Sequence, residues 1–165
     1  PLALAPLVLA ACGGGPPEVP LAFQPLPICA EPALRALEER RDARFAEWAP
    51  WAARENAGDR AAAWRALARM GRTVDLEGRD AELLALARSE RDPRVAIEIA
   101  FALPRTRCTT AETWLLEALR HEDGRVRAGA ARGLALLGGA PPWQALLAQL
   151  SDEHPLARAD AATAL

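Results

Sequence analysis

Two pairs of adjacent residues in this chain of 165 residues could hold a metal ion, because each joins an imidazole to a carboxylate. They are His121-Glu122 and Glu153-His154. A protein metal site needs several converging side chains of this kind, and the chain contains only 2 histidines. We therefore interpret both pairs as solvent-exposed turn residues and expect no metal and no cofactor.

The cysteines Cys29 and Cys108 could form a disulfide if the chain is exported to an oxidising compartment. The bond would close a loop of about 80 residues and stabilise the fold by roughly 2–4 kcal/mol. The alternative is two separate thiols, buried as small apolar groups. Both readings stay open. The sequence contains no recognisable Ser-His-Asp, Cys-His or phosphate-loop motif, so we expect the protein not to be an enzyme.

Composition restricts the classes of partner. Hydrophobic residues make up 51% of the chain and charged residues 25%, so the chain can bury a core. The formal net charge of −2 argues against nucleic acid, which usually requires a basic surface.

A repeat of 31 residues organises the part of the chain that must position these groups. Leu84, Leu115 and Leu146 recur at this interval, and most of their neighbours recur with them. A fixed period of this size indicates stacked supersecondary units. We expect three antiparallel helix pairs, at about 80–108, 109–139 and 140–165, with the last one truncated.

Each helix of the repeats has a predicted cap. Asp80 and the pair Thr109 and Glu112, which would form a capping box, are expected to begin first helices. Asp92, Asp123 and His154 fill one equivalent position before the second helices, and proline follows two of them. Pro104 and Gly138-Gly139 end repeats.

Helical spacing places apolar residues on one face of every helix, and stacking of neighbouring pairs would bury them. The second helices contribute Val95, Ile99, Leu103, Val126, Ala130, Leu134, Ala157, Ala161 and Leu165. The first helices contribute Leu83, Leu84, Leu86, Trp114, Leu115, Leu119, Leu146, Leu147 and Leu150.

Residues 28–79 form an N-terminal helical segment, or a degenerate repeat. One helix is expected from Pro32 to about Trp48, interrupted by Pro50. A second is expected to be capped by Asp59 and to stop at Gly71, with a loop from Gly71 to Arg79.

The repeats resemble HEAT-like repeats of the short bacterial type, which also occur in phycobilin lyases. The shared pattern is Asp-x-x-Val-Arg followed by an Ala-rich helix and a closing Gly, nearly complete from Asp123 to Gly138. Ala96 departs from it where Arg is usual. The resemblance covers about residues 59–165 and implies an all-α fold, a right-handed α-α superhelix (α-solenoid) of antiparallel helix pairs.

Two enzyme families on such repeats do not fit this chain. Deoxyhypusine hydroxylases hold a di-iron centre through His-Glu pairs that open second helices. Here His121-Glu122 precedes the cap Asp123, and His154 itself occupies a cap position. A bilin lyase would act on cytoplasmic phycobiliproteins, which an exported protein does not meet.

The N-terminus resembles the signal of a bacterial lipoprotein. An apolar run over residues 1–11 ends in Leu9-Ala10-Ala11-Cys12, which is similar to a lipobox. The resemblance implies cleavage before Cys12 and its acylation. Gly13 is not the Asp that retains such proteins in the inner membrane, so we expect an outer-membrane protein facing the periplasm of a Gram-negative bacterium. Residues 12–27, rich in Gly and Pro, would form an unstructured tether.

Basic residues gather on or before the second helices and could form a binding surface. They are Arg94, Arg125, Arg127, Arg132 and Arg158, with Trp143 as the tryptophan most expected to be exposed. The alternative is an ordinary solvated face on which Glu98 and Asp160 neutralise the arginines.

These observations predict a lipid-anchored protein of the cell envelope that acts as a non-catalytic scaffold for an unknown protein partner. The alternatives are an accessory repeat segment of a larger lipoprotein and a repeat-scaffold enzyme. The chain stops at Leu165 inside a second helix without a polar capping repeat, so we expect further repeats or self-association.

The repeat register makes one prediction about stability. Leu115→Asp should place an unpaired charge in the stack and cost several kcal/mol. Thermal unfolding of the variant measures this cost. An unfolding midpoint equal to that of the parent would mean that the register is wrong.

Overall fold

Helices make up the regular structure of the described part of the chain. The computed structural model describes residues 32–40, 43–138 and 142–165. Within these residues the α-helices are α1 (Pro32–Arg40), α2 (Phe45–Ala52), α3 (Ala57–Met70), α4 (Asp80–Ser89), α5 (Pro93–Ala102), α6 (Ala111–Ala118), α7 (Gly124–Leu137), α8 (Trp143–Gln149) and α9 (Pro155–Ala164). Short 3-10 turns follow α3 and α5, at Gly71–Thr73 and Leu103–Arg105.

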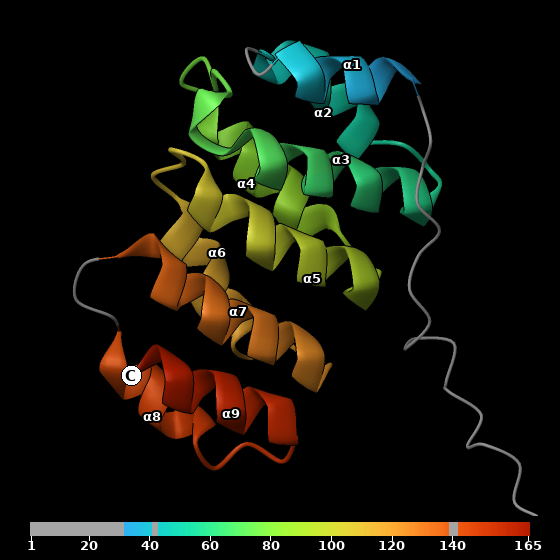
Figure 1. Cartoon of the computed structure of the whole chain (residues 1–165). Coiled ribbons are helices and arrows are strands. Elements are labelled where there is room, and N and C mark those ends of the chain that lie inside the picture. Colours follow the sequence, from blue (N-terminus) through green and yellow to red (C-terminus); the bar gives the residue numbers. More distant parts are fainter. Residues whose placement is uncertain (1–31, 41–42, 139–141) are drawn as a thin grey trace, which may run out of the picture.

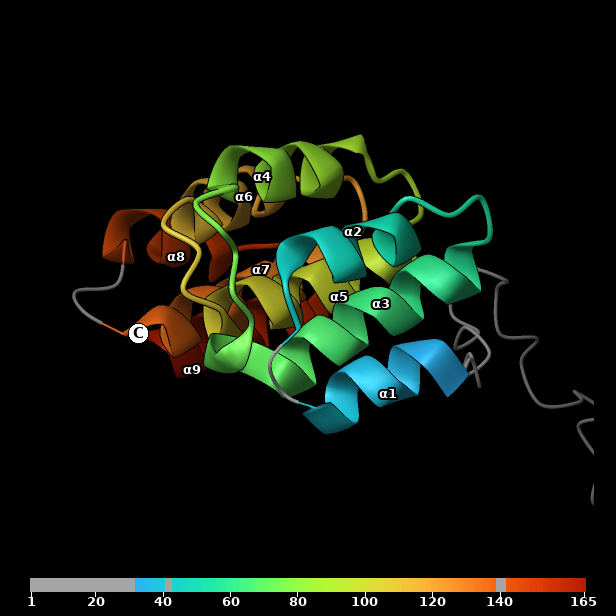
Figure 2. The same ribbon diagram turned by 90° about the horizontal axis from the view of Figure 1, so that it is seen from above.

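The helices stack as antiparallel pairs in two layers. Helices α3, α5, α7 and α9 lie side by side in one layer, and each packs against the next. Helices α2, α4, α6 and α8 form the other layer, and α1 covers the outer side of α3 (Figure 2). The stack runs from α1 and α2 at one end to α8 and α9 at the other (Figure 1). The prediction of an all-α solenoid is confirmed.

The caps of the two central second helices are confirmed. The carboxylate of Asp92 accepts a hydrogen bond from the backbone N–H of Arg94 at 2.9 Å, with Pro93 as the first residue of α5. Asp123 accepts from the N–H of Arg125 at 2.8 Å in the same way. Each bond satisfies an N–H that has no partner inside its helix. His154 occupies the equivalent position, but its side chain makes no capping bond.

The caps predicted for the first helices are wrong, because their side chains join neighbouring repeats instead. Asp80 lies inside α4, and its carboxylate accepts from the backbone N–H of Thr109 at 2.6 Å. Helix α6 therefore begins at Ala111 after Thr110, and Thr109 with Glu112 forms no capping box. One hydrogen bond between residues 29 positions apart in the sequence is therefore present in place of the two local capping interactions that were predicted.

The N-terminal boundaries also differ from the prediction. The helix expected from Pro32 to Trp48 is two helices, because Arg44 leaves the helical conformation and forms a bridge with Asp75. Pro50 lies inside α2, which ends two residues later at Ala52. Asn56, and not Asp59, caps α3 by accepting from the N–H of Gly58 at 2.7 Å. Gly71 ends α3 with a φ of 57°, as predicted.

The predicted apolar faces form the core. Val95, Ile99, Val126, Ala130 and Leu115 are fully buried. Leu83, Leu103, Trp114, Leu119, Leu134, Leu146, Ala157 and Ala161 are also buried, whereas Leu84 and Leu86 are half-buried and Leu147, Leu150 and Leu165 are exposed. The core continues into α2 and α3, where Trp48 and Trp64 pack edge to face at 4.9 Å. The Trp48 indole N–H donates to the carbonyl of Ala63 at 2.7 Å.

Helices α5 and α7 approach each other closely. A Cβ added to Gly133 would lie 2.7 Å from the backbone carbonyl oxygen of Ala100, which cannot move aside. One added to Gly129 would lie 3.3 Å from the Cβ of Ala100. Small residues thus set the distance between these two helices.

Candidate interaction surface

Three arginines occupy the same place in the repeats and hold the turn before their helix. Arg60, Arg127 and Arg158 are each the fourth residue of a second helix, in α3, α7 and α9. Each guanidinium donates to the backbone carbonyls five and six residues earlier. These bonds are 2.6 and 3.0 Å long for Arg60, 2.9 and 2.8 Å for Arg127, and 3.0 and 2.8 Å for Arg158.

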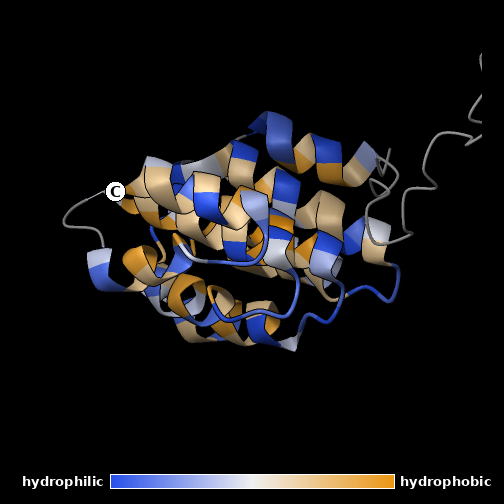
Figure 3. Ribbon diagram, turned by 90° about the horizontal axis from the view of Figure 1, so that it is seen from below, coloured by the Kyte–Doolittle hydropathy of each residue, from blue (hydrophilic) through white to orange (hydrophobic). Residues whose placement is uncertain are grey.

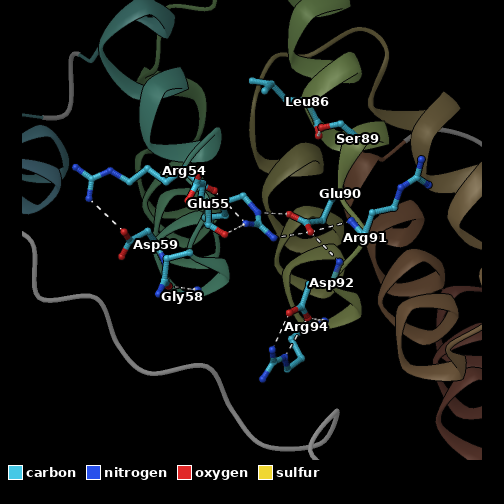
Figure 4. A network of polar contacts seen from close by, with 12 residues as sticks. Arg54, Glu55, Gly58, Asp59, Leu86, Ser89, Glu90, Arg91, Asp92 and Arg94 are labelled. Atoms are coloured by element: carbon cyan, nitrogen blue, oxygen red, sulfur yellow. Dashed lines mark hydrogen bonds and ion pairs between the residues drawn. The ribbon is translucent and has the colours of Figure 1, made fainter.

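Two of these arginines also reach a carboxylate of the next repeat. Arg60 pairs with Glu90 at 2.7 Å, and Arg127 pairs with Asp152 at 2.7 Å. Glu90 and Asp152 stand two residues before the cap of the following second helix, and each also accepts from the N–H of that cap residue. Figure 4 shows Glu90 at this turn, beside Asp92 and opposite Arg54 and Glu55. We call these contacts the arginine ladder.

The ladder acids are held in their charged form. The hydrogen bond from Arg127 keeps the pKa of the Asp152 carboxyl below its ordinary value. Burial would raise the pKa of Glu90, but Arg60 and the N–H groups of Asp92 and Arg91 lower it below its ordinary value. The Asp152 side chain is only 6% exposed, so its loss would leave Arg127 with its two backbone carbonyls and with the exposed Glu153 as its remaining carboxylate.

A second set of ion pairs links the same helices further along. Arg65, the ninth residue of α3, pairs with Glu98 of α5 at 2.8 Å. Arg132, the ninth residue of α7, pairs with Asp160 of α9 at 2.7 Å. Both acids are the sixth residues of their helices.

The interface between α5 and α7 lacks both kinds of pair in the described structure. Ala96 replaces the ladder arginine, and His121 replaces the acid. Phe101 and Gly129 occupy the positions of the second pair. The close approach at Gly129 and Gly133 fills the second gap with apolar contact, and the Arg132 guanidinium lies 5.6 Å from the ring centre of Phe101.

Exposed large apolar side chains gather at one end of the stack. In the described part of the chain they are Leu136, Trp143, Leu147, Leu150, Leu156 and Leu165. All of them lie on or beside the last three helices. Figure 3 looks onto this end, where hydrophobic and hydrophilic residues are mixed along the helices. We define the C-terminal face as Trp143, Leu147, Leu150, Leu156 and Leu165 together with Arg158.

Two residues of the C-terminal face correspond to residues that the preceding repeat buries. Leu165 is 49% exposed, whereas its counterpart Leu134, 31 residues earlier, is 3% exposed. Leu150 is 38% exposed, and its counterpart Leu119 is 3% exposed. Arg158 holds its own turn like the other ladder arginines, but no carboxylate of the described residues pairs with it. The face therefore has the chemistry of a stacking surface.

The predicted basic surface is largely neutralised by internal contacts. Arg94 and Arg125 pair with the cap residues Asp92 and Asp123, and Arg132 pairs with Asp160. Arg127 is 9% exposed and belongs to the interior, so it cannot contribute to an open surface. Arg158 is exposed.

Trp143 is 56% exposed, as predicted, and its role in binding stays a prediction. Sequence reasoning missed Arg60, Glu90 and Asp152. The arginines share one position in the repeats, which is a readable signal, but their acids lie in the next repeat.

The remaining predicted sites are only partly covered by the structure. Cys12 and Cys29 lie outside the described residues, so acylation and the disulfide stay predictions. Cys108 is buried, which raises the pKa of its thiol, and its sulfur lies 3.1 Å from the Thr110 hydroxyl. Among the described residues, no group of three His, Cys, Asp or Glu side chains could hold a metal. Nor does any helix of the described residues have the length and apolar character to cross a membrane.

The ladder can be tested with a matched pair of substitutions. Arg127→Ala should destabilise the fold by about 3 kcal/mol or more, because it strands a buried carboxylate and two carbonyls. Arg158→Ala removes only exposed contacts and should cost less than about 1 kcal/mol. Urea unfolding of both variants measures the difference. Equal costs would contradict the role assigned to the ladder.

Comparison with known proteins supports the repeat assignment. A family model described as HEAT repeats matches residues 81–165, which is just over half of the chain. The match spans α4 to α9, and so covers both the C-terminal face and the broken part of the ladder. Neither the curated proteins nor the solved structures yield a match. The chain therefore belongs to the family of HEAT repeat proteins.

Proposed function

We propose that this protein is a non-catalytic scaffold that binds a protein partner through its C-terminal face. The observation that carries the proposal is the exposure of Leu150 and Leu165, whose counterparts in the preceding repeat are buried. Repeat arrays offer extended surfaces to partners, and a contiguous exposed apolar patch usually marks an interaction site.

The chemistry of the face indicates the kind of partner. Inside the stack, an equivalent face is covered by a helix pair that brings apolar side chains and a carboxylate for the ladder arginine. The C-terminal face offers the same two features in Leu165 and Arg158. The partner that fits is a helix pair with an acidic residue in the turn before its second helix. Another helical protein or a second copy of this chain would supply it.

We also propose that a lipid anchors the protein to the cell envelope. The support is the sequence alone: Leu9-Ala10-Ala11-Cys12 at the end of an apolar run, followed by a Gly and Pro-rich segment. Two or more acyl chains on Cys12 would hold the protein firmly at a membrane. The tether would let the scaffold reach a partner away from the bilayer surface.

The interaction can be tested by site-specific cross-linking of the full chain in its own cell envelope. A photoreactive residue at Leu147 should join the protein to one partner, identified by mass spectrometry as a helical protein or a second copy. Leu150→Arg with Leu156→Arg should abolish the product, because both charges stand on the face.

Ala81→Arg with Thr113→Arg adds the same charge at exposed positions of α4 and α6, and should leave the cross-link unchanged. The same product from the face variant, or no product from the parent, would contradict the proposal.

Anchoring makes a separate prediction. The mature protein should begin at Cys12 and carry acyl groups, so that it extracts only with detergent. Cys12→Ser should keep residues 1–11 and release the protein from membranes. N-terminal mass spectrometry checks both forms, and a parent chain without acyl groups would sink the idea.

A further inference from the structure

The gap in the arginine ladder opens a pocket on the surface. It lies between the pairs α4–α5 and α6–α7 and has a volume of about 460 Å³. Ala96 and His121, the two residues that replace a ladder arginine and its acid, both line it. Its other lining residues are Ala87, Arg88, Glu90, Arg91, Trp114, Glu117, Ala118 and Glu122.

The turn at the gap has the same backbone as the turns where the ladder is intact. The caps Asp92, Asp123 and His154 have φ between −82° and −85° and ψ between 116° and 124°. His121 also keeps the local role of the acid, since its Nδ1 accepts from the N–H of Asp123 at 3.0 Å. An imidazole that accepts through Nδ1 carries its proton on Nε2, so it offers no second acceptor to an arginine.

Two backbone carbonyls at this gap lack the side-chain donor that the equivalent carbonyls have in other repeats. In the turns before α3, α7 and α9, an arginine donates to both carbonyls five and six residues earlier. At Ala96 the equivalent carbonyls are those of Glu90 and Arg91. No side chain in the described ranges donates to either of them.

The charged residues of the pocket largely neutralise one another. Its lining contains three acids, Glu90, Glu117 and Glu122, and two arginines, Arg88 and Arg91, and Glu90 is already paired with Arg60. Arg88 is engaged by Glu117 in a bidentate pair, while Glu122 is exposed at the rim. Figure 4 shows Arg91 extending away from Glu90. Trp114 is buried in the core and only 6% exposed, so a small part of its ring borders the pocket, where it can contact a guanidinium.

We propose that this pocket binds an arginine side chain of a partner protein, which takes the place of the missing ladder arginine. The guanidinium fork donates to the carbonyls of Glu90 and Arg91, and Glu122 balances its charge. A lysine fits less well, because a point charge cannot span two carbonyls in one plane. This site is separate from the C-terminal face, and it rests on the proposed function only in requiring a protein partner.

The pocket can be tested without that partner. The probe is N-acetyl-arginine amide, titrated into the full chain and followed by NMR at the His121 imidazole and the Trp114 indole. Both signals should shift and saturate in the low millimolar range. N-acetyl-citrulline amide, which has the same shape without the charge, should bind at least about tenfold more weakly.

Substitutions locate the site. Ala96→Arg should fill the pocket from within, as Arg158 fills its own turn, and abolish the shifts at His121 and Trp114. Ala148→Arg adds the same charge on the exposed side of α8 and should leave the titration unchanged. Circular dichroism checks that both variants keep their helices.

Three results would each overturn the proposal: no saturation with the arginine probe, equal binding of the citrulline probe, or full binding by folded Ala96→Arg. If Ala96→Arg does not fold, the contrast between the two probes on the parent chain still decides the question. Cross-linking at the C-terminal face does not depend on this pocket, so each idea can fail without the other.

Discussion

The apolar faces of α3, α5, α7 and α9 leave water only when a neighbouring helix pair covers them, and the remaining structure follows from this constraint. Ile99 and Ala130 are fully buried because α5 and α7 lie against their neighbours on both sides. Leu165 belongs to the same series but has no pair beyond it in the structure, and half of its surface is exposed. One interaction therefore explains both the core and the C-terminal face.

Polar contacts fix the position of each repeat relative to the next, which the non-directional apolar contacts alone do not specify. The pairs Arg60–Glu90 and Arg127–Asp152 bind each arginine to its own turn and to the next one, which fixes the spacing of the repeats. Between α5 and α7 the same task falls to Gly129 and Gly133, which bring the two backbones together. Because this close packing holds α5 and α7 together, the interface does not need a ladder arginine at Ala96 or an acid at His121. The absence of that pair leaves a polar pocket at the surface.

Much of the fold could be predicted from the sequence, because the repeat of 31 residues states the pairing of the helices and Asp92 and Asp123 mark where second helices begin. Other boundaries could not be predicted. Asn56 and Asp59 are both good caps by residue type, and in the structure Asn56 caps α3 while Asp59 lies in its first turn. Asp80 looked like a local cap, but tertiary structure brings Thr109 to it.

The interaction surface was harder to predict, because the same sequence pattern of arginines occurs whether the side chains face solvent or pair with an acid in the next repeat. Arg127 was expected on a binding surface and is instead an interior link to Asp152. Arg158 occupies the same position in its own repeat but is exposed to solvent. The difference lies in what covers each residue and not in its own sequence neighbourhood.

Hydrogen–deuterium exchange of the full chain, resolved by peptide, tests the central claim most directly. If neighbouring pairs stabilise one another, amides of α5 and α7 in residues 1–165 should exchange slowest and those of α8 and α9 much faster, because within these residues the pair α8–α9 packs against α7 on one side only. Protection of α8 and α9 equal to that of α7 in the unbound protein would contradict the account.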